Sequence, residues 1–445
     1  MLSRFFRLQE NGTTIGRELQ AGLTTFAAMA YVLTVNPAIL ANAGMDRAAL
    51  VTITALSAAT ATALMALMTN YPIALAPGMG INAFFAFTIC LGAGVPWAQA
   101  LGMVFVNGCL FLLLSLTGMR EKIIDSIPYP LKIAITCGIG ILIAFLGLKN
   151  GGVVVASPAT FITHGDFAGA PVALCLAGIL LTVVLVAWRV PGAIVLGMAA
   201  VTLAGTLVPD GKGGMVTQLP AQWFSLPASP APHLLKLDLS FLTDAAAFLK
   251  MLPLILTLLL VDLFDNIGTL IGVTKRAGFL GADGKLPKVG RALVADSIAV
   301  ILSSLFGTST VVSYVESSSG VEAGGRTGLT TLTTAVLMLA ALFLTPLILA
   351  VPAVATAPAL VVVGVFMLQS AAEIKMDDFT IAVPAVLTII AIPLTFSIAQ
   401  GIGLGLIAAA ALAIATGKPR GFTPVGYVIA AMFFLEFFHL FPFHG

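Results

Sequence analysis

The sequence contains little charge. Asp, Glu, Lys and Arg make up 9% of its 445 residues, against roughly 25% in an ordinary soluble domain. The 21 basic and 19 acidic residues leave a net charge of +2, so no overall field attracts nucleic acid or a strongly acidic partner. This composition excludes a water-soluble enzyme.

Cysteine and histidine are also scarce. The cysteines lie in apolar stretches without metal-ligand spacing, which indicates small buried hydrophobes rather than a disulfide framework: Cys90, Cys109, Cys137 and Cys175. The histidines lie in loops or near the C-terminus, at His164, His233, His439 and His444. No HExxH or other zinc spacing is present. We therefore expect no metal and no bound cofactor.

Apolar residues instead fill most of the chain, at 59% of the total. A membrane-spanning helix needs about 20 of them in succession. Seven candidate spans precede a Pro- and Gly-rich connector at 209–245 and seven follow it, which predicts an all-α polytopic membrane protein. The spans lie at 19–40, 48–69, 73–92, 97–117, 129–147, 169–187 and 190–208, and at 247–273, 290–306, 308–321, 327–350, 353–371, 379–396 and 397–416. A further stretch, 421–441, suits an interfacial or subunit-contact helix as well as a span.

The basic residues test this count, because Lys and Arg collect in cytoplasmic loops. With a cytoplasmic N-terminus, the outside keeps five of the 21, namely Arg47, Lys149, Lys212, Lys236 and Lys250. This predicts a multi-pass protein of the cytoplasmic membrane whose connector is extracytoplasmic. Because seven is odd, the second half starts on the opposite side, and the halves form the inverted repeat typical of secondary transporters.

Two spans are interrupted at equivalent places in the two halves. In the third span, Pro77, Gly78 and Gly80 come directly before Asn82 and Phe84. In the tenth span, Gly307 precedes Thr308, Ser309, Thr310 and Glu316. Each predicts extended backbone leading into a half-helix, so that two helix N-termini face one another across a polar cavity. The alternative is that the glycines only allow close helix packing.

Four carboxylates fall in the spans of the second half: Asp262, Asp265, Asp296 and Glu316. Each costs about 2.5–3.5 kcal/mol at a helix centre, and so needs a partner, a proton or a function. Hydrogen bonding to neighbouring helices is an alternative for Asp262, and pinning of the ninth segment for Asp296. At Glu316, a helix N-terminus and desolvation have opposite effects on the charge, which suits a group that exchanges a proton near neutral pH.

Carboxylates, hydroxyls, backbone N–H groups and phenylalanine faces together suit a small, flat, uncharged heteroaromatic ligand. Its ring N–H groups would donate to a carboxylate, and Phe26 or Phe84 would stack on the ring. Inorganic anions fit poorly, because carboxylates without a basic partner repel them.

Four segments carry a resemblance to a known family. TTFAAMAYVLTVNPAIL, LAPGMGINAFFAF, VDLFDNIGTLIGVT and GTSTVVSYVESSSGVEAGGRTGLT resemble the motifs of the AzgA-like purine permeases, in the nucleobase/ascorbate transporter superfamily with the uracil-permease fold. The resemblance implies a core domain, 1–117 and 246–350, and a gate domain, 118–208 and 351–445. It also implies proton symport of adenine, guanine or hypoxanthine by an elevator-like movement. Carriers of this fold are often homodimers.

By motif position, the resemblance places Asp265 and Glu316 at the two acidic substrate-contacting positions and associates Asp296 with coupling. We therefore expect Asp296, together with one of the two substrate-contacting acids, to carry the coupling proton. We expect a substrate site that combines Asp265 and Glu316 with Thr25, Phe26, Asn82, Phe84, Thr308, Ser309 and Thr310. The alternatives are a sulphate- or dicarboxylate-type anion carrier of the same fold, a membrane-embedded enzyme, and a channel.

Overall fold

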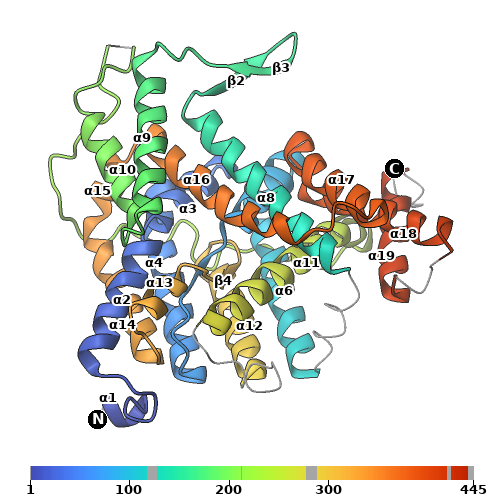
Figure 1. The fold of residues 1–445 in the computed structure, drawn as a ribbon, viewed down its shortest axis with the longest axis horizontal. Helices are drawn as coiled ribbons and strands as arrows, with labels where there is room; N and C mark the ends of the chain where they lie inside the picture. The colour runs from blue at the N-terminus through green and yellow to red at the C-terminus, as the bar shows by residue number, and fades with distance from the viewer. Residues whose placement is uncertain (1, 118–127, 212, 277–287, 418–421, 439–445) are drawn as a thin grey trace.

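The computed structural model describes residues 2–117, 128–211, 213–276, 288–417 and 422–438. It does not describe the side chains of several residues inside helices α11 and α19, Asp265 and Glu436 among them. In these ranges the chain is mainly helical, and its elements follow the predicted spans in order (Figure 1). Within the described residues, ten helices are long and apolar enough to cross a membrane, and four shorter apolar helices accompany them. The predicted polytopic all-α fold is confirmed.

The first half begins with the short α1 (Leu2–Phe5) and contains one span that the sequence did not show to be broken. The predicted 19–40 helix is divided into α2 and α3 at Ala30 and Tyr31. The elements are α2 (Ile15–Met29), α3 (Val32–Leu40), α4 (Arg47–Thr69), β1 (Leu75–Pro77), α5 (Met79–Ala83), the π-helix η2 (Phe84–Gly92), α6 (Trp97–Thr117), α8 (Tyr129–Asn150), α9 (Ala170–Ala187) and α10 (Ala193–Ala204). A hairpin of β2 (Val154–Ser157) and β3 (Phe161–His164) joins α8 to α9.

The second half repeats the pattern of a strand leading into a short helix. Its elements are α11 (Ala245–Arg276), α12 (Val289–Phe306), β4 (Val311–Ser313), α13 (Ser317–Glu322), α14 (Gly328–Ala340), α15 (Thr345–Ala350), α16 (Ala353–Leu368), α17 (Phe379–Thr395) and α18 (Ile398–Ala415). The leftover stretch forms α19 (Pro424–Phe437), which packs on α18. Residues 439–441 of that stretch, with His439, lie outside the described residues, as does His444.

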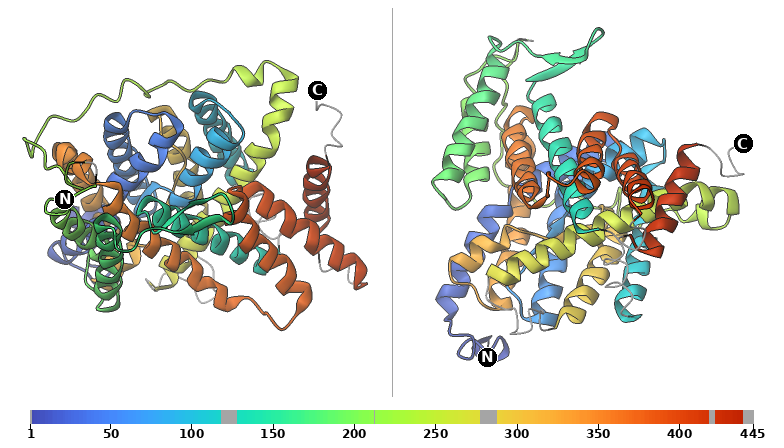
Figure 2. Two further views of the ribbon diagram at one scale, coloured as in Figure 1. Left: turned by 90° about the horizontal axis from the view of Figure 1, so that it is seen from above. Right: turned by 45° about the vertical axis from the view of Figure 1, so that its right-hand side comes forward.

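The helices pack in two groups, which Figure 2 shows from two further directions. In one group, α14 packs against α2 and α4, and α12 packs against α4 and α6. In the other, α8 packs against α16 and α17, and α9 and α10 pack against α16. The groups combine segments from both halves, as the inverted repeat requires. The boundaries of the core and gate domains stay a prediction.

The connector between the halves runs as extended chain over the first group of helices (Figure 2, left). The hydroxyl of Thr52 on α4 donates to the carbonyl of Ala228, 2.8 Å away. The backbone N–H of Asp46, at the start of α4, donates to Nε2 of His233 over 2.9 Å. His233 is 3% exposed. The connector is therefore attached to the ends of these helices.

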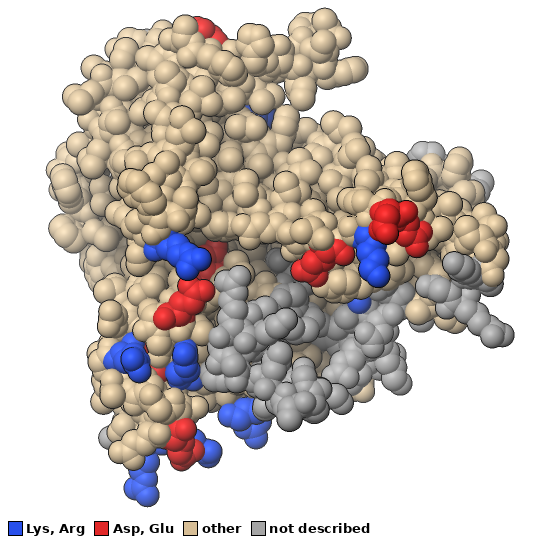
Figure 3. Space-filling view, viewed as in Figure 1, with Lys and Arg blue, Asp and Glu red and all other residues tan. Residues whose placement is uncertain are grey.

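Charged side chains are unevenly distributed on the surface. On the face drawn in Figure 3, lysines and arginines gather toward the end that carries the N-terminus, and the upper part of this face is almost entirely uncharged. Large apolar side chains such as Leu180, Leu394 and Phe379 are at least two-thirds exposed. A wide uncharged belt of this kind is what a lipid environment requires.

Candidate binding site at the crossing of two strands

The two interrupted spans meet in the middle of the fold. β1 and β4 pair antiparallel, with Ala76 opposite Val312. The ladder continues beyond the strands, because the N–H of Gly78 donates to the carbonyl of Thr310 over 3.0 Å. All six strand residues are buried. This confirms the extended backbone predicted in both segments and brings together residues more than 230 positions apart.

We call the paired strands β1 and β4 the crossing. Each strand leads into a short helix, so that two helix N-termini lie next to it. α5 begins one residue after β1 and runs into the π-helix η2. A Cβ atom at Gly78 would lie 2.8 Å from Cγ2 of Val312, so the glycine allows the two strands to approach. On the other side, Glu316 is the N-cap residue of α13. Backbone N–H groups at such ends favour ligands that offer acceptors.

Polar side chains from four elements meet beside the strands. Ser309 donates its hydroxyl hydrogen to Oδ1 of Asn82. Thr308 accepts from the amide of Asn36 on α3 over 3.3 Å, and the same amide donates to Thr54 on α4 over 2.7 Å. Three of the predicted residues, Asn82, Thr308 and Ser309, are therefore together. Asn36 was not predicted, although its motif, TVNP, places a polar side chain next to a proline inside an apolar span.

Several polar side-chain atoms of Asn36 and of the predicted site residues are buried but not satisfied. The amide nitrogen of Asn82, the hydroxyls of Thr25 and Thr310, and Oδ1 of Asn36 have no hydrogen-bond partner in the part of the chain that the structure describes. All four residues are 0% exposed. A buried polar group without a partner costs about 1–3 kcal/mol. Groups of this kind are candidates to bind a polar ligand or water.

Glu316 is held by a residue that sequence reasoning missed. The hydroxyl of Tyr31, at the break between α2 and α3, donates to Oε1 of Glu316 over 2.7 Å. Tyr31 is 2% exposed, and Glu316 is half-buried. Nothing local in the sequence marks this bond, because 285 positions separate the two residues.

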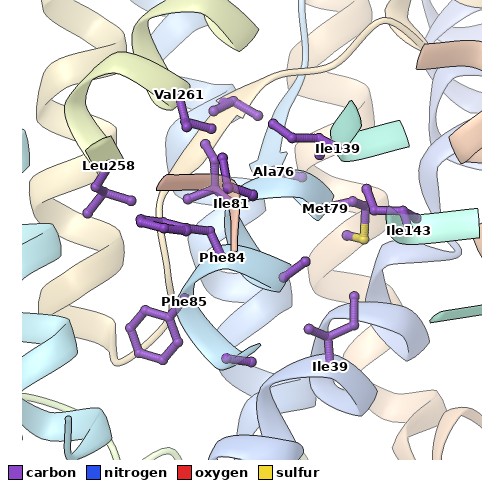
Figure 4. Packing of buried hydrophobic residues seen from close by; sticks show 14 of the residues in the cluster. Ile39, Ala76, Met79, Ile81, Phe84, Phe85, Ile139, Ile143, Leu258 and Val261 are labelled. Carbon is purple, nitrogen blue, oxygen red and sulfur yellow. The ribbon is translucent and has the colours of Figure 1, made fainter. Parts of the chain in front are cut away.

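The two predicted aromatic residues differ in accessibility. Phe84 is 0% exposed and belongs to the main hydrophobic cluster with Ile81, Phe85 and Leu258 (Figure 4). Phe26 on α2 is half-buried at the edge of the same cluster. Phe26 is therefore the better placed of the two to meet a ligand. Its neighbour Thr25 packs so closely against α13 that a side chain at position 320, where the residue is Gly320, would have no space.

The acids occupy different environments. Asp262 on α11 is 0% exposed and accepts from the amide of Asn107 on α6 over 2.9 Å, which confirms hydrogen bonding to a neighbouring helix. Asp296 is buried in α12. Asp265 follows Asp262 on α11 by three residues, but its side chain lies outside the described residues, and its substrate contact stays a prediction.

A fifth acid, Glu18, was not among the candidates. It is 0% exposed in the first turn of α2 and binds the N-terminus of α14. Its carboxylate accepts from the backbone N–H groups of Arg326, Thr327 and Thr330 at 2.9, 3.2 and 3.2 Å, and from both threonine hydroxyls at 2.7 Å. The sequence offered one signal for Glu18, because it is a single acid at the start of an apolar span. Its role is structural, because a carboxylate is favoured at a helix N-terminus.

Comparison with known proteins agrees with this architecture. A family model described as a permease family matches residues 16–417. The guanine/hypoxanthine permease PbuG of Bacillus subtilis is 43% identical over 448 residues, which cover 99% of this chain and 100% of that protein. The adenine permease AdeP of Escherichia coli is 41% identical over 438 residues, with coverage of 98% and 96%. These matches confirm the resemblance to purine permeases found in the motifs.

Among solved structures, the transmembrane domain of the cyanobacterium bicarbonate transporter BicA has a TM-score of 0.62 at 18% identity, and the match covers 88% of this chain and 97% of that one. At this identity the likeness concerns the fold alone. The family match and the relatives named as permeases exclude the enzyme alternative. The chain belongs to the permease family and is a multi-pass membrane transport protein.

Proposed function

We propose that the chain is a proton-coupled importer of purine nucleobases, taking up hypoxanthine and guanine, adenine, or both across the cytoplasmic membrane. The observation that carries the proposal is the crossing of β1 and β4. There a carboxylate, Glu316, lies at the edge of a group of buried amides and hydroxyls whose partners are incomplete within the described part of the chain. The names of PbuG and AdeP support the choice of substrate.

The chemistry of a purine matches these groups. The base carries ring N–H donors for carboxylates and ring nitrogens that accept from an amide such as that of Asn82. Glu316, with Asp265 as implied by the family resemblance, would accept from the N–H edge. Thr310 would bond the opposite edge. Phe26 would contact the face of the ring, where an aromatic contact contributes about 0.5–1.5 kcal/mol beyond its buried area.

The coupling proton would be carried by the same acids. A carboxylate can be neutralised by a proton, and it can accept a hydrogen bond from an N–H group of the base. Because the same group takes part in both, binding of the proton changes the affinity for the base, and binding of the base changes the affinity for the proton. We assign this role to Glu316 and Asp265, with Asp296 on α12 supporting them. Movement of the core domain against the gate domain would then carry base and proton across together. We expect a homodimer with cytoplasmic N-termini.

An anion carrier is the second candidate, because BicA shares the fold. The carboxylate at the crossing argues against it. Glu316 has a tyrosine hydroxyl as its partner, so an anion bound nearby would meet an acid that no arginine or lysine is shown to neutralise. Uptake of radiolabelled sulphate and bicarbonate separates the two candidates.

The decisive experiment is uptake of labelled hypoxanthine, guanine and adenine in cells lacking their own purine permeases. We expect the wild-type chain to restore uptake, a protonophore to abolish it, and Glu316→Gln and Asp265→Asn each to reduce it at least tenfold. The matched control is Glu322→Gln, the same substitution at an exposed acid six positions away. Normal uptake of all three bases by both site variants would refute the assignment. Competition by a panel of unlabelled bases at several pH values then gives the substrate range.

A further inference from the structure

Tyr31 occupies an unusual place in the fold. It is the N-cap residue of α3, where the first span breaks, and its own carbonyl accepts from the N–H groups of Thr34 and Val35. The break points the tyrosine toward α13, which packs against α2. The ring is 2% exposed, so its hydroxyl is aimed into the protein interior and not toward lipid.

The hydroxyl makes a bond that joins two interrupted segments. It donates to Oε1 of Glu316 over 2.7 Å, a short distance typical of a donor to a carboxylate. Because a carboxylate offers about four acceptor positions, this bond fixes one oxygen and leaves capacity for a ligand. The N-cap position holds the backbone of Glu316, and the tyrosine holds its side chain.

We propose that Tyr31 is a positioning residue that orients the Glu316 carboxylate for both the substrate and the coupling proton. The inference rests on the proposed transport function. A phenol suits this role because it both donates and accepts. It donates to the ionised carboxylate, and it can accept from the protonated acid, so the side chain keeps its direction in both states. An ammonium or guanidinium group, which donates but cannot accept, would favour only the ionised form.

Other charged groups near Glu316 have different positions. The elements packed against α13 are α2 and α11. The helix itself ends at Glu322, and Arg326 lies four residues further along the chain. Glu18 is bound to the N-terminus of α14, Asp262 is bound to Asn107, and Arg326 donates to the carbonyls of Val321 and Gly325. The remaining charged residues of α2 and α11 are Arg17, Lys250, Asp265, Lys275 and Arg276. Among the side chains that the structure describes, the hydroxyl of Tyr31 is the one shown bonded directly to the carboxylate.

The test compares Tyr31→Phe with Tyr314→Phe. Tyr314 is 5% exposed, two residues before Glu316, and its hydroxyl donates to the carbonyl of Pro77 over 2.6 Å. Both variants therefore lose one buried hydroxyl near the crossing. The hydroxyl of Tyr31 is bonded to the carboxylate, and that of Tyr314 is bonded to a backbone carbonyl. In purified protein, the infrared band of the protonated acid is followed through a pH titration, and the band absent from Glu316→Gln is assigned to this residue.

We expect Tyr31→Phe to move the midpoint of that band by about one pH unit toward alkaline pH, a tenfold change in proton affinity, because the ionised form loses a donor. Tyr314→Phe should keep the wild-type midpoint. In uptake assays, Tyr31→Phe should raise the KM for the transported base about tenfold and shift the pH profile in the same direction. A wild-type midpoint in Tyr31→Phe would overturn the inference. Because the infrared measurement needs no substrate, failure of purine uptake by the wild-type chain would instead count against the proposed function.

Discussion

Glu18 offers the sharpest test of how the core of this protein is held together. Its carboxylate is fully buried and accepts five hydrogen bonds at the start of α14, three of them from backbone N–H groups. We predict that Glu18→Gln, which keeps the shape but replaces one acceptor oxygen by a donor NH₂ group, strongly destabilises this contact.

The magnitude follows from the bonds that change. The Gln amide can place its oxygen toward Thr327 and Thr330, but its NH₂ group then faces the N–H of Arg326, and one buried donor is left unpaired. That costs about 1–3 kcal/mol. Loss of the negative charge at a helix N-terminus adds up to about 2 kcal/mol. We therefore expect a loss of about 3 kcal/mol, roughly a 150-fold change in the unfolding equilibrium.

The assay is thermal unfolding of the detergent-solubilised protein. With an unfolding entropy of about 2.1 cal/mol/K per residue, a chain of this length loses roughly 0.9 kcal/mol per degree, so Tm should fall by about 3 °C. The matched control is Glu10→Gln. Glu10 pairs with Arg7 at 3.7 Å, and both side chains are about 70% exposed, so Tm should change by less than about 1 °C. Equal Tm values for the two variants would refute the reasoning.

Two further predictions concern other contacts. A Cβ atom at Gly320 would collide with the hydroxyl of Thr25, so Gly320→Ala should reduce purine uptake and lower Tm. The control Gly16→Ala, whose Cβ would meet open space, should leave uptake and Tm unchanged. If Gly16→Ala were impaired and Gly320→Ala were not, the packing described here would be contradicted. Burial lowers the pKa of His233, although Asp46 partly opposes this. The folded state therefore loses stability as pH falls below about 6.5, so the connector should be cleaved faster by protease at pH 5 than at pH 7.5, and this difference should disappear in His233→Phe.

The interrupted spans could be predicted because their cause is local. Pro77, Gly78 and Gly307 break helical sequence at matched positions, and non-helical backbone at membrane depth must line a site or be buried. The break at Tyr31 had no such signal, because AAMAYV is compatible with a continuous helix.

The neighbours of the site residues could not be read from the sequence either. Asp262 and Asp265 share a helix face by spacing, yet the partner of Asp262 is Asn107, 155 positions earlier. Phe84 was expected to stack on the ligand because it follows the interruption at Pro77, Gly78 and Gly80. In the structure Phe84 is the first residue of the π-helix η2, and the ring of Phe84 is enclosed by apolar residues.

We expect the crossing itself to stay intact during transport. Strand groups that lack a partner strand are bonded to side chains: Thr62 binds both the N–H and the carbonyl of Leu75, at 2.9 and 2.8 Å, and Tyr314 binds the carbonyl of Pro77. If these bonds broke in the protein interior, where no water can replace them, each backbone group left unpaired would cost about 1–3 kcal/mol. Opening the strands is therefore an expensive route to alternating access. Movement of the crossing and its helices as one body, as the elevator proposal requires, keeps every one of these bonds and places the change at the boundary between the two helix groups.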